Sequence, residues 1–185
     1  MEENAKLIEQ AAADIRTMSY LFHPPLLDEL GLDSALQWYI DGFAERSKIA
    51  AKLELLTDGD RLPQDHELCL FRITQECLTN IHRHSESSTA LVRLLRSPGE
   101  IKLEVSDDGK GLDPETQSKI ASGETVGVGL RGMRERVRQL GGSLEIQSNG
   151  HGTMVIATVP FEGSARSSDN GHLAHSRVAM TKTEP

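Results

Sequence analysis

The sequence is poor in aromatic residues, cysteine and positive charge. Only 4% of its 185 residues are aromatic, so the core of a folded domain must be mainly aliphatic. Acidic residues outnumber lysine and arginine by 28 to 20, for a net charge of −8. That balance argues against direct nucleic-acid binding through bulk positive charge. No run of about 18 apolar residues occurs, so we also expect no membrane contact by this chain.

The two cysteines, Cys69 and Cys77, lie eight positions apart in a helical pattern. About 12 Å of helix rise separates them, which is too far for a disulfide. The sequence therefore predicts a reducing, cytoplasmic location. It leaves open whether a longer protein is anchored in a membrane.

Hydrophobic periodicity predicts an alternation of helices and short strands. We expect helices over 3–22, 33–47, 64–83 and 130–140, a short one near 114–121, and strands over 52–57, 90–95, 100–106, 143–148 and 153–159. Tight connections at Ser97-Pro98-Gly99 and Asn149-Gly150 require antiparallel neighbours. The predicted fold is α+β, a two-layer sandwich of a mixed, mostly antiparallel sheet and about three helices, preceded by an amphipathic helix.

A glycine-rich segment leads into the helix predicted at 130–140. Gly127-Val128-Gly129-Leu130-Arg131-Gly132 matches the dinucleotide-binding fingerprint literally, but no strand precedes it. A Rossmann domain is therefore excluded, and the absence of a Walker A sequence excludes a P-loop NTPase. The N–H groups at such a helix start favour a phosphate; a flexible loop is the alternative.

A second glycine-containing segment follows the strand predicted at 100–106. In Asp107-Asp108-Gly109-Lys110-Gly111, a carboxylate at a strand end can accept a hydrogen bond from an exocyclic amine. The two glycines would let a flat ring approach the backbone. An ordinary Asp-Gly turn is the alternative interpretation.

The helix predicted at 64–83 has one broad apolar arc. The arc contains Leu70, Phe71, Ile73, Cys77, Leu78 and Ile81. Glu76 and Asn80 lie one turn apart at its margin, where Asn80 can offer an oxygen to a cation and Glu76 can act as a base. A solvated polar pair is the alternative. Thr153, after Gly152, either helps to hold a ring or simply begins a strand.

These four signals occur in an order that resembles the Bergerat-fold (GHKL) ATPases. The chain is most similar to the ATP-binding domain of sensor histidine kinases of the NarX/DegS type. The similar stretches are FRITQECLTNIHRHS, LEVSDDGKGL, GVGLRGMRERVRQLGG and GHGTMVIATVP.

The resemblance implies ATP and Mg²⁺ as cofactors. Asn80 would bind Mg²⁺, and Glu76 would be the catalytic group near the γ-phosphate. Arg83, where the family usually has lysine, and His84 would lie near the phosphates. Asp107 would accept the adenine amino hydrogen.

The remaining site residues also follow from the resemblance. Gly109 and Gly111 would shape the ring pocket, and Thr153 would support adenine. The second glycine box, Gly127, Val128, Gly129 and Leu130, would close over the phosphates. Residues 112–126 would form a mobile lid.

The family also implies a domain division and partners. Residues 1–24 would be part of a dimerisation and phosphotransfer hairpin, 25–32 a linker, 33–162 the catalytic domain and 163–185 a flexible tail. No phosphoacceptor motif is present, and His23 precedes prolines at a helix end, so we expect a catalytic fragment. The partners would be a second copy, through the missing hairpin, and a response-regulator receiver domain joined to a DNA-binding output domain.

Two other functions are compatible with the motifs. One is an anti-sigma serine kinase or a nucleotide-switched regulator of the same superfamily, which would not need the helix and proline break of residues 1–32. The other is a degenerate nucleotide-binding module, against which intact Glu76, Asn80 and Asp107 argue.

Overall fold

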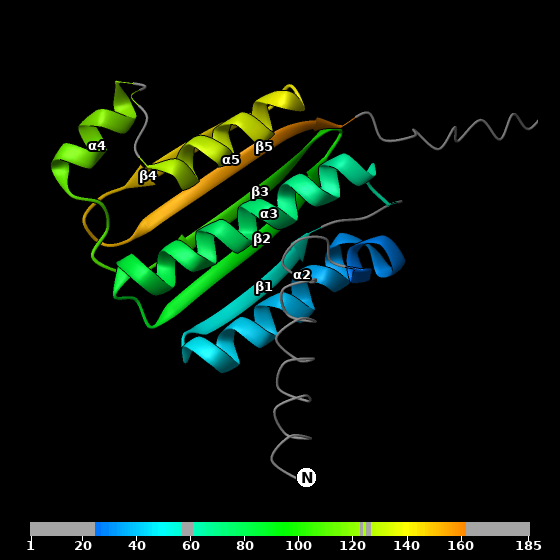
Figure 1. Cartoon of the computed structure of the whole chain (residues 1–185), viewed down its shortest axis with the longest axis horizontal. Helices are drawn as coiled ribbons and strands as arrows, with labels where there is room; N and C mark the ends of the chain where they lie inside the picture. The colour runs from blue at the N-terminus through cyan, green and yellow to red at the C-terminus, as the bar shows by residue number, and fades with distance from the viewer. Residues whose placement is uncertain (1–24, 57–60, 123, 125–126, 162–185) are drawn as a thin grey trace, which may run out of the picture.

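The computed structural model describes residues 25–56, 61–122, 124 and 127–161. Its elements are α2 (Pro25–Ser47), β1 (Ala50–Leu56), α3 (Gln64–Asn80), the π-helical turn η1 (Ile81–Ser85), β2 (Thr89–Ser97), β3 (Gly99–Asp107), α4 (Pro114–Ala121), α5 (Val128–Gln139), β4 (Ser143–Ser148) and β5 (Thr153–Phe161) (Figure 1). The expected helix at 3–22 and the expected tail at 163–185 lie outside the described residues.

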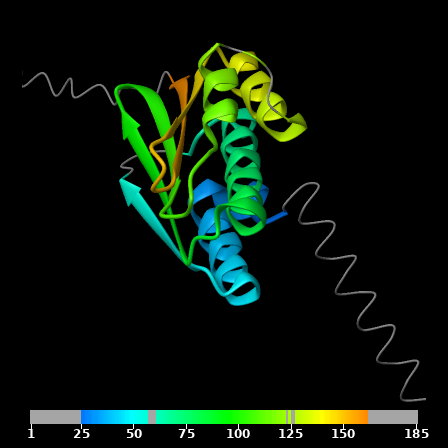
Figure 2. The same ribbon diagram turned by 90° about the vertical axis from the view of Figure 1, so that its left-hand side faces the viewer.

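The strands form one five-stranded sheet in the order β1-β2-β3-β5-β4. β1 pairs parallel with β2, and the other three pairings are antiparallel. Helices α2, α3 and α5 lie on one face of this sheet (Figure 2). The predicted α+β sandwich with a mixed, mostly antiparallel sheet is confirmed.

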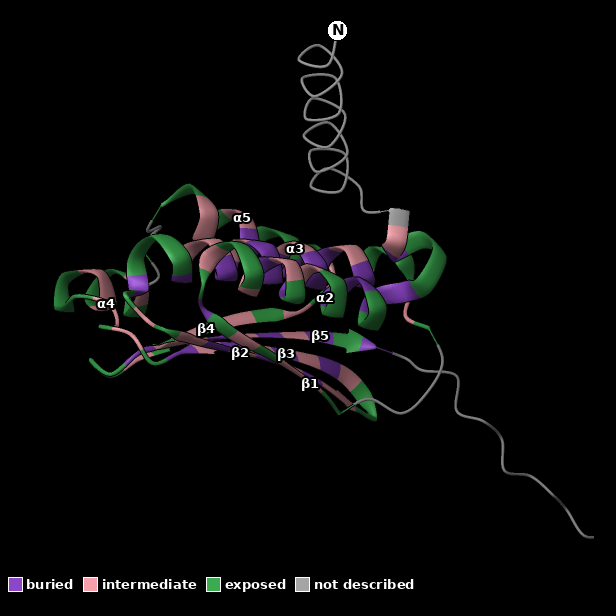
Figure 3. Ribbon diagram, turned by 90° about the horizontal axis from the view of Figure 1, so that it is seen from below, coloured by how far each residue is buried: buried purple, intermediate pink, exposed green. Residues whose placement is uncertain are grey.

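The core lies between the helices and the sheet (Figure 3). It is mainly aliphatic, as the composition predicts, with Phe43, Phe71 and Phe161 as its buried aromatic side chains among the described residues. The whole predicted apolar arc of α3 is buried. Cys69 and Cys77 are both buried free thiols, as their spacing predicts.

The helix expected to start at residue 33 corresponds to the second part of α2, after a break at Gly31, whereas the helical segment that begins at Pro25 was not expected. Proline is well tolerated at the first position of a helix, where its missing N–H has no partner to lose. A break at Gly31, with φ of 81°, interrupts α2. The segment expected as a linker, 25–32, is therefore part of this broken helix, and its Leu27 and Leu32 are buried in the core.

Other boundaries differ by a few residues. The helix expected to end at Arg83 is α-helical to Asn80 and continues as the π turn η1. Helix α5 begins two residues before the expected Leu130, and Asp107 belongs to β3 rather than to the loop.

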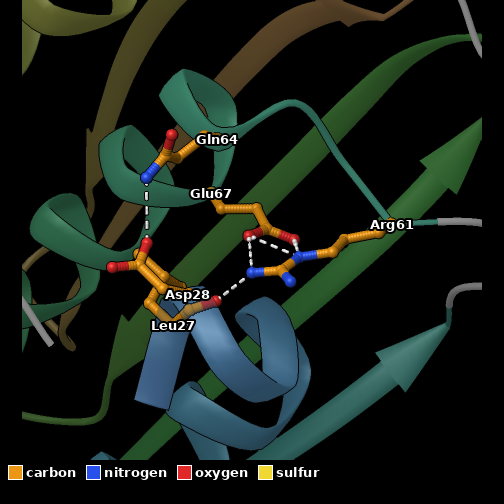
Figure 4. Close-up of polar contacts among 5 residues, drawn as sticks. All are labelled: Leu27, Asp28, Arg61, Gln64 and Glu67. Atoms are coloured by element: carbon orange, nitrogen blue, oxygen red, sulfur yellow. Dashed lines mark hydrogen bonds and ion pairs between the residues drawn. The ribbon is translucent and has the colours of Figure 1, made fainter. Parts of the chain in front are cut away.

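A polar cluster joins the N-terminal end of α3 to the start of α2 (Figure 4). Glu67 is 1% exposed, and its carboxylate accepts hydrogen bonds from Arg61 Nε and Nη2 at 3.2 Å. Arg61 Nη2 also donates to the carbonyl of Leu27. Gln64 Nε2 donates to Asp28 Oδ1 at 2.9 Å. These contacts satisfy a buried charge and fix the first turn of α2 beside α3.

Candidate functional site

A cavity of about 1240 Å³ opens between α3, the end of β3 and the start of α5. Eleven of the twelve residues predicted as site residues line it: Glu76, Asn80, Arg83, His84, Asp107, Gly111, Gly127, Val128, Gly129, Leu130 and Thr153. These residues come from four separate segments of the chain: 76–84, 107–111, 127–130 and 153. The exception is Gly109, which is not among the residues that line the cavity.

Glu76 and Asn80 are the polar residues that α3 offers to the cavity. Both are half-buried, at the margin of the apolar face that packs on the sheet. Glu76 lies against the first turn of α5, since a Cβ at Gly129 would be 1.9 Å from its Oε1. Because Gly129 has no side chain, the Glu76 carboxylate can lie in contact with the first turn of α5.

The π turn η1 carries Arg83 and His84 to the mouth of the cavity. A π turn adds a residue to the helical repeat, which turns the following side chains away from the direction that an α-helix would give them. The turn ends at Ser85, whose carbonyl accepts a hydrogen bond from the Lys110 N–H at 2.8 Å. The Arg83 guanidinium and the His84 imidazole thus line the same cavity as the first residues of α5.

Gly109 has a packing role that the sequence did not predict. A Cβ at this position would lie 2.1 Å from the Ser85 carbonyl oxygen, so only glycine fits. Its N–H donates to Asp107 Oδ1 at 2.8 Å. Gly109 acts on the cavity indirectly, by holding the Asp107 carboxylate.

Asp107 is the buried carboxylate of the site, with 9% of its surface exposed. Burial raises its pKa above the ordinary value, and hydrogen bonds from the backbone of Gly109 and Thr153 partly oppose this shift. The carboxylate is an acceptor only, and it lines the cavity together with the apolar side chains of Val105 and Val155.

The structure adds apolar walls that the motifs did not indicate. Val105, Ile146 and Val155 come from the adjacent strands β3, β4 and β5, and Leu112 follows the glycine segment. Along each of these strands more buried residues alternate with less buried ones, and Val105, Ile146 and Val155 are among the more buried residues. The sequence contains no signal for the sheet order that brings these strands together.

The start of the segment expected as a lid is fixed by Ser148. Its hydroxyl accepts a hydrogen bond from the Leu112 N–H at 2.9 Å and donates to the Gly152 carbonyl at 2.8 Å. Helix α4 follows, and Asp113 Oδ1 caps it by accepting from the Thr116 N–H at 2.9 Å. Residues 123, 125 and 126 of the expected lid lie outside the described residues, so its mobility stays a prediction.

The fold and the cavity define a class of domain: an α+β sandwich in which helices cover one face of a mixed sheet and a large cavity opens beside the end of β3. The chain belongs to the family described as histidine kinase-, DNA gyrase B- and HSP90-like ATPases, whose model matches residues 65–163. This stretch is more than half of the chain, and the family implies ATP as the ligand.

Within this family, the sequence is similar to sensor histidine kinases. It is 33% identical over 157 residues to the signal transduction histidine-protein kinase/phosphatase DegS of Brevibacillus brevis, covering 84% of this chain and 39% of that protein. It is 34% identical over 160 residues to the sensor histidine kinase MctS of Rhizobium johnstonii, covering 86% of this chain and 34% of that protein. The chain thus spans little more than a third of these relatives.

The fold is also found among solved structures. The blue-light activated histidine kinase EL346 of Erythrobacter litoralis matches with a TM-score of 0.59 and 23% identity, over 71% of this chain and 42% of that one. In the part of the chain that the structure describes, no helix is long and apolar enough to cross a membrane.

Proposed function

We propose that this chain is the ATP-binding, phosphoryl-donating domain of a two-component sensor histidine kinase that works in the cytoplasm. The observation that supports the proposal most strongly is the convergence on one cavity of a buried acceptor, Asp107, with Glu76, Asn80 and the N-terminus of α5. These groups match the two ends of ATP, a purine with an exocyclic amine and a chain of anionic phosphates.

The purine would bind at the Asp107 end. A carboxylate that already accepts two backbone N–H groups has a further lone pair for the adenine amine. Val105, Ile146 and Val155 supply apolar surface for the ring faces. A guanine would present an oxygen to the carboxylate instead, so this arrangement favours adenine.

The phosphates would bind at the other end, near the N-terminus of α5. The free N–H groups of that first turn and the positive end of the helix dipole favour anions. Arg83 adds a cationic side chain to the lining of the same cavity, and His84 adds an imidazole that can donate a hydrogen bond. This local arrangement explains how a chain with a net charge of −8 can hold a polyanion.

Asn80 is the side chain we assign to Mg²⁺. Among the described residues, no three His, Cys, Asp or Glu side chains gather as a ready-made metal site. An amide oxygen from Asn80 suits a hard cation that takes its other ligands from phosphate oxygens and water. When bound, the ion would neutralise phosphate charge and orient the γ-phosphate.

Glu76 lies one helical turn before Asn80, and we assign it the role of the base that acts on the incoming histidine. In this reaction an imidazole nitrogen bonds to the γ-phosphorus while the bond to the β–γ bridging oxygen breaks and ADP leaves. Glu76 would orient the imidazole and accept its ring proton. Catalysis of this kind depends mainly on placement and charge.

The histidine would be presented by a helical hairpin through which two copies dimerise. The phosphoryl group would then pass to an aspartate of a response-regulator receiver domain, which in this class is commonly joined to a DNA-binding domain. Similarity to DegS and MctS supports this course of events.

The proposal is tested by mixing the chain with a histidine-bearing helical hairpin of a related kinase and γ-labelled ATP. We expect acid-labile, alkali-stable phosphohistidine that requires Mg²⁺. Glu76→Gln should still bind ATP but lose at least about 100-fold in rate, while the exposed control Glu135→Gln should keep the parent rate. Label on serine instead would contradict the proposal and favour the anti-sigma kinase class.

A further inference from the structure

Ser148, the last residue of β4, joins two parts of the site that lie far apart in the sequence. Its hydroxyl makes the hydrogen bonds to the Leu112 N–H and the Gly152 carbonyl described above. The side chain is half-buried. One small group therefore connects the beginning of the α4 segment to the beginning of β5.

The Gly152 side of this connection leads directly to the buried carboxylate. Gly152 precedes Thr153, which pairs with Asp107 across β3 and β5. A Cβ at Gly152 would lie 2.0 Å from the Asp107 carbonyl oxygen, so the two strand ends are in close contact. A shift of Gly152 would therefore move the backbone that holds Asp107.

The Leu112 side leads to a different segment of the cavity lining. Leu112 lines the cavity, and Gly111 before it has φ of 71°. A Cβ at Gly111 would lie 2.7 Å from Ser148 Oγ, so glycine is needed for the hydroxyl to reach the next N–H. The hydroxyl thus sets where the chain leaves the adenine end of the cavity and turns towards α4.

We propose that Ser148 is a positioning residue for the nucleotide, which fixes the Leu112 wall relative to Asp107. This inference rests on the proposed function, because the ligand it concerns is ATP. Ser148 is not among the residues that line the cavity, so it acts through Leu112 and Gly152 rather than by touching the nucleotide.

An alanine at 148 removes both hydrogen bonds while leaving the strand residue in place. The two walls would then be free to move apart, and part of the binding free energy would be used to bring them back. We expect the dissociation constants for ATP and for adenosine to rise by the same factor, about ten-fold, on the basis of two lost hydrogen bonds. Equal factors are expected because the contact lies at the purine end.

The test compares four proteins by calorimetry and by hydrogen exchange: the parent, Ser148→Ala, Ser148→Thr and Ser143→Ala. Ser148→Thr keeps the hydroxyl and should stay within about two-fold of the parent. Ser143→Ala changes an exposed serine at the other end of β4 and should bind like the parent. In Ser148→Ala alone, the Leu112 amide should exchange at least about ten-fold faster. With phosphotransfer as the readout, KM for ATP should rise and kcat should stay within two-fold.

Three results would overturn the inference. They are an unchanged affinity in Ser148→Ala, an equal loss in Ser148→Thr, and a loss confined to the triphosphate with adenosine unaffected. If the parent itself fails to bind ATP, the proposed function is wrong, and this inference falls with it. Parent binding together with an unaffected Ser148→Ala would reject the inference alone.

Discussion

Replacing Arg61 by methionine should destabilise the fold far more than its position in a surface connection suggests. The change removes the partner of Glu67, whose side chain is 2% exposed, whereas the Arg61 side chain is 47% exposed. Breaking a fully buried pair costs about 3–5 kcal/mol, and breaking an exposed one about 0–1 kcal/mol. Because only one partner is buried, we expect a loss of about 2–3 kcal/mol in the free energy of unfolding.

Urea unfolding followed by far-UV circular dichroism measures this loss. The matched control is Arg138→Met, since Arg138 pairs with Glu135 on the surface of α5 and its side chain is 79% exposed. That variant should lose less than about 1 kcal/mol. The double variant Arg61→Met/Glu67→Gln should be more stable than Arg61→Met, because no buried charge then lacks a partner. Equal losses in Arg61→Met and Arg138→Met would refute the reasoning.

Three further outcomes follow from the geometry. Gly129→Ala should displace the Glu76 carboxylate, because the added Cβ would lie 1.9 Å from Glu76 Oε1. The rate of phosphotransfer should then fall about 100-fold. The melting temperature of the variant should stay within a few degrees of the parent's. Gly152→Ala should cost at least about 2 kcal/mol in urea unfolding, because φ is 126° and the Cβ would meet the Asp107 main chain. Burial raises the pKa of the Cys77 thiol, so this thiol should react with a disulfide reagent only as fast as the protein unfolds.

Each of these outcomes has a result that would contradict it. Normal phosphotransfer in the Gly129 variant would show that the position of Glu76 does not matter. An unchanged free energy of unfolding in the Gly152 variant would show that the strand ends are not in close contact. Rapid labelling of Cys77 in the native protein would show that the thiol is accessible.

Much of the fold could be predicted because strand alternation and glycine turns are local signals. β4 was predicted with its observed ends, Ser143 and Ser148, since a polar segment or a glycine bounds it on each side. The start of α2 was missed because Pro25 was read as the end of one helix rather than the start of another. The break falls at Gly31, whose φ of 81° is a conformation that glycine adopts readily.

The site was predicted less completely than the fold. Asp107 and the glycines around it were found because a carboxylate and tight turns have recognisable patterns. Ile146, Val155 and Ser148 were missed, since they matter only when β4 and β5 lie beside the end of β3. That placement is a property of the sheet order, which residue spacing does not encode.

The role of Asp107 is tested most directly by titrating ATP into the parent, Asp107→Asn and the exposed neighbour Asp108→Asn. Asparagine would present a donor where the adenine amine needs an acceptor, so we expect a loss of about 10- to 100-fold in affinity. Burial raises the Asp107 pKa, which means that the fold disfavours the charged form; the asparagine variant should therefore melt no lower than the parent. For the same reason the parent's affinity should be complete at neutral pH and decline as the pH falls through that raised pKa, above the ordinary value of 3.8.

The decisive comparison is between the two asparagine variants at pH 7.5 with Mg²⁺ present. The account predicts that Asp108→Asn binds ATP like the parent and that Asp107→Asn, still folded, binds it about 10- to 100-fold more weakly. Equal, parent-like affinity in both variants would contradict the central claim that the buried carboxylate at the end of β3 holds the purine.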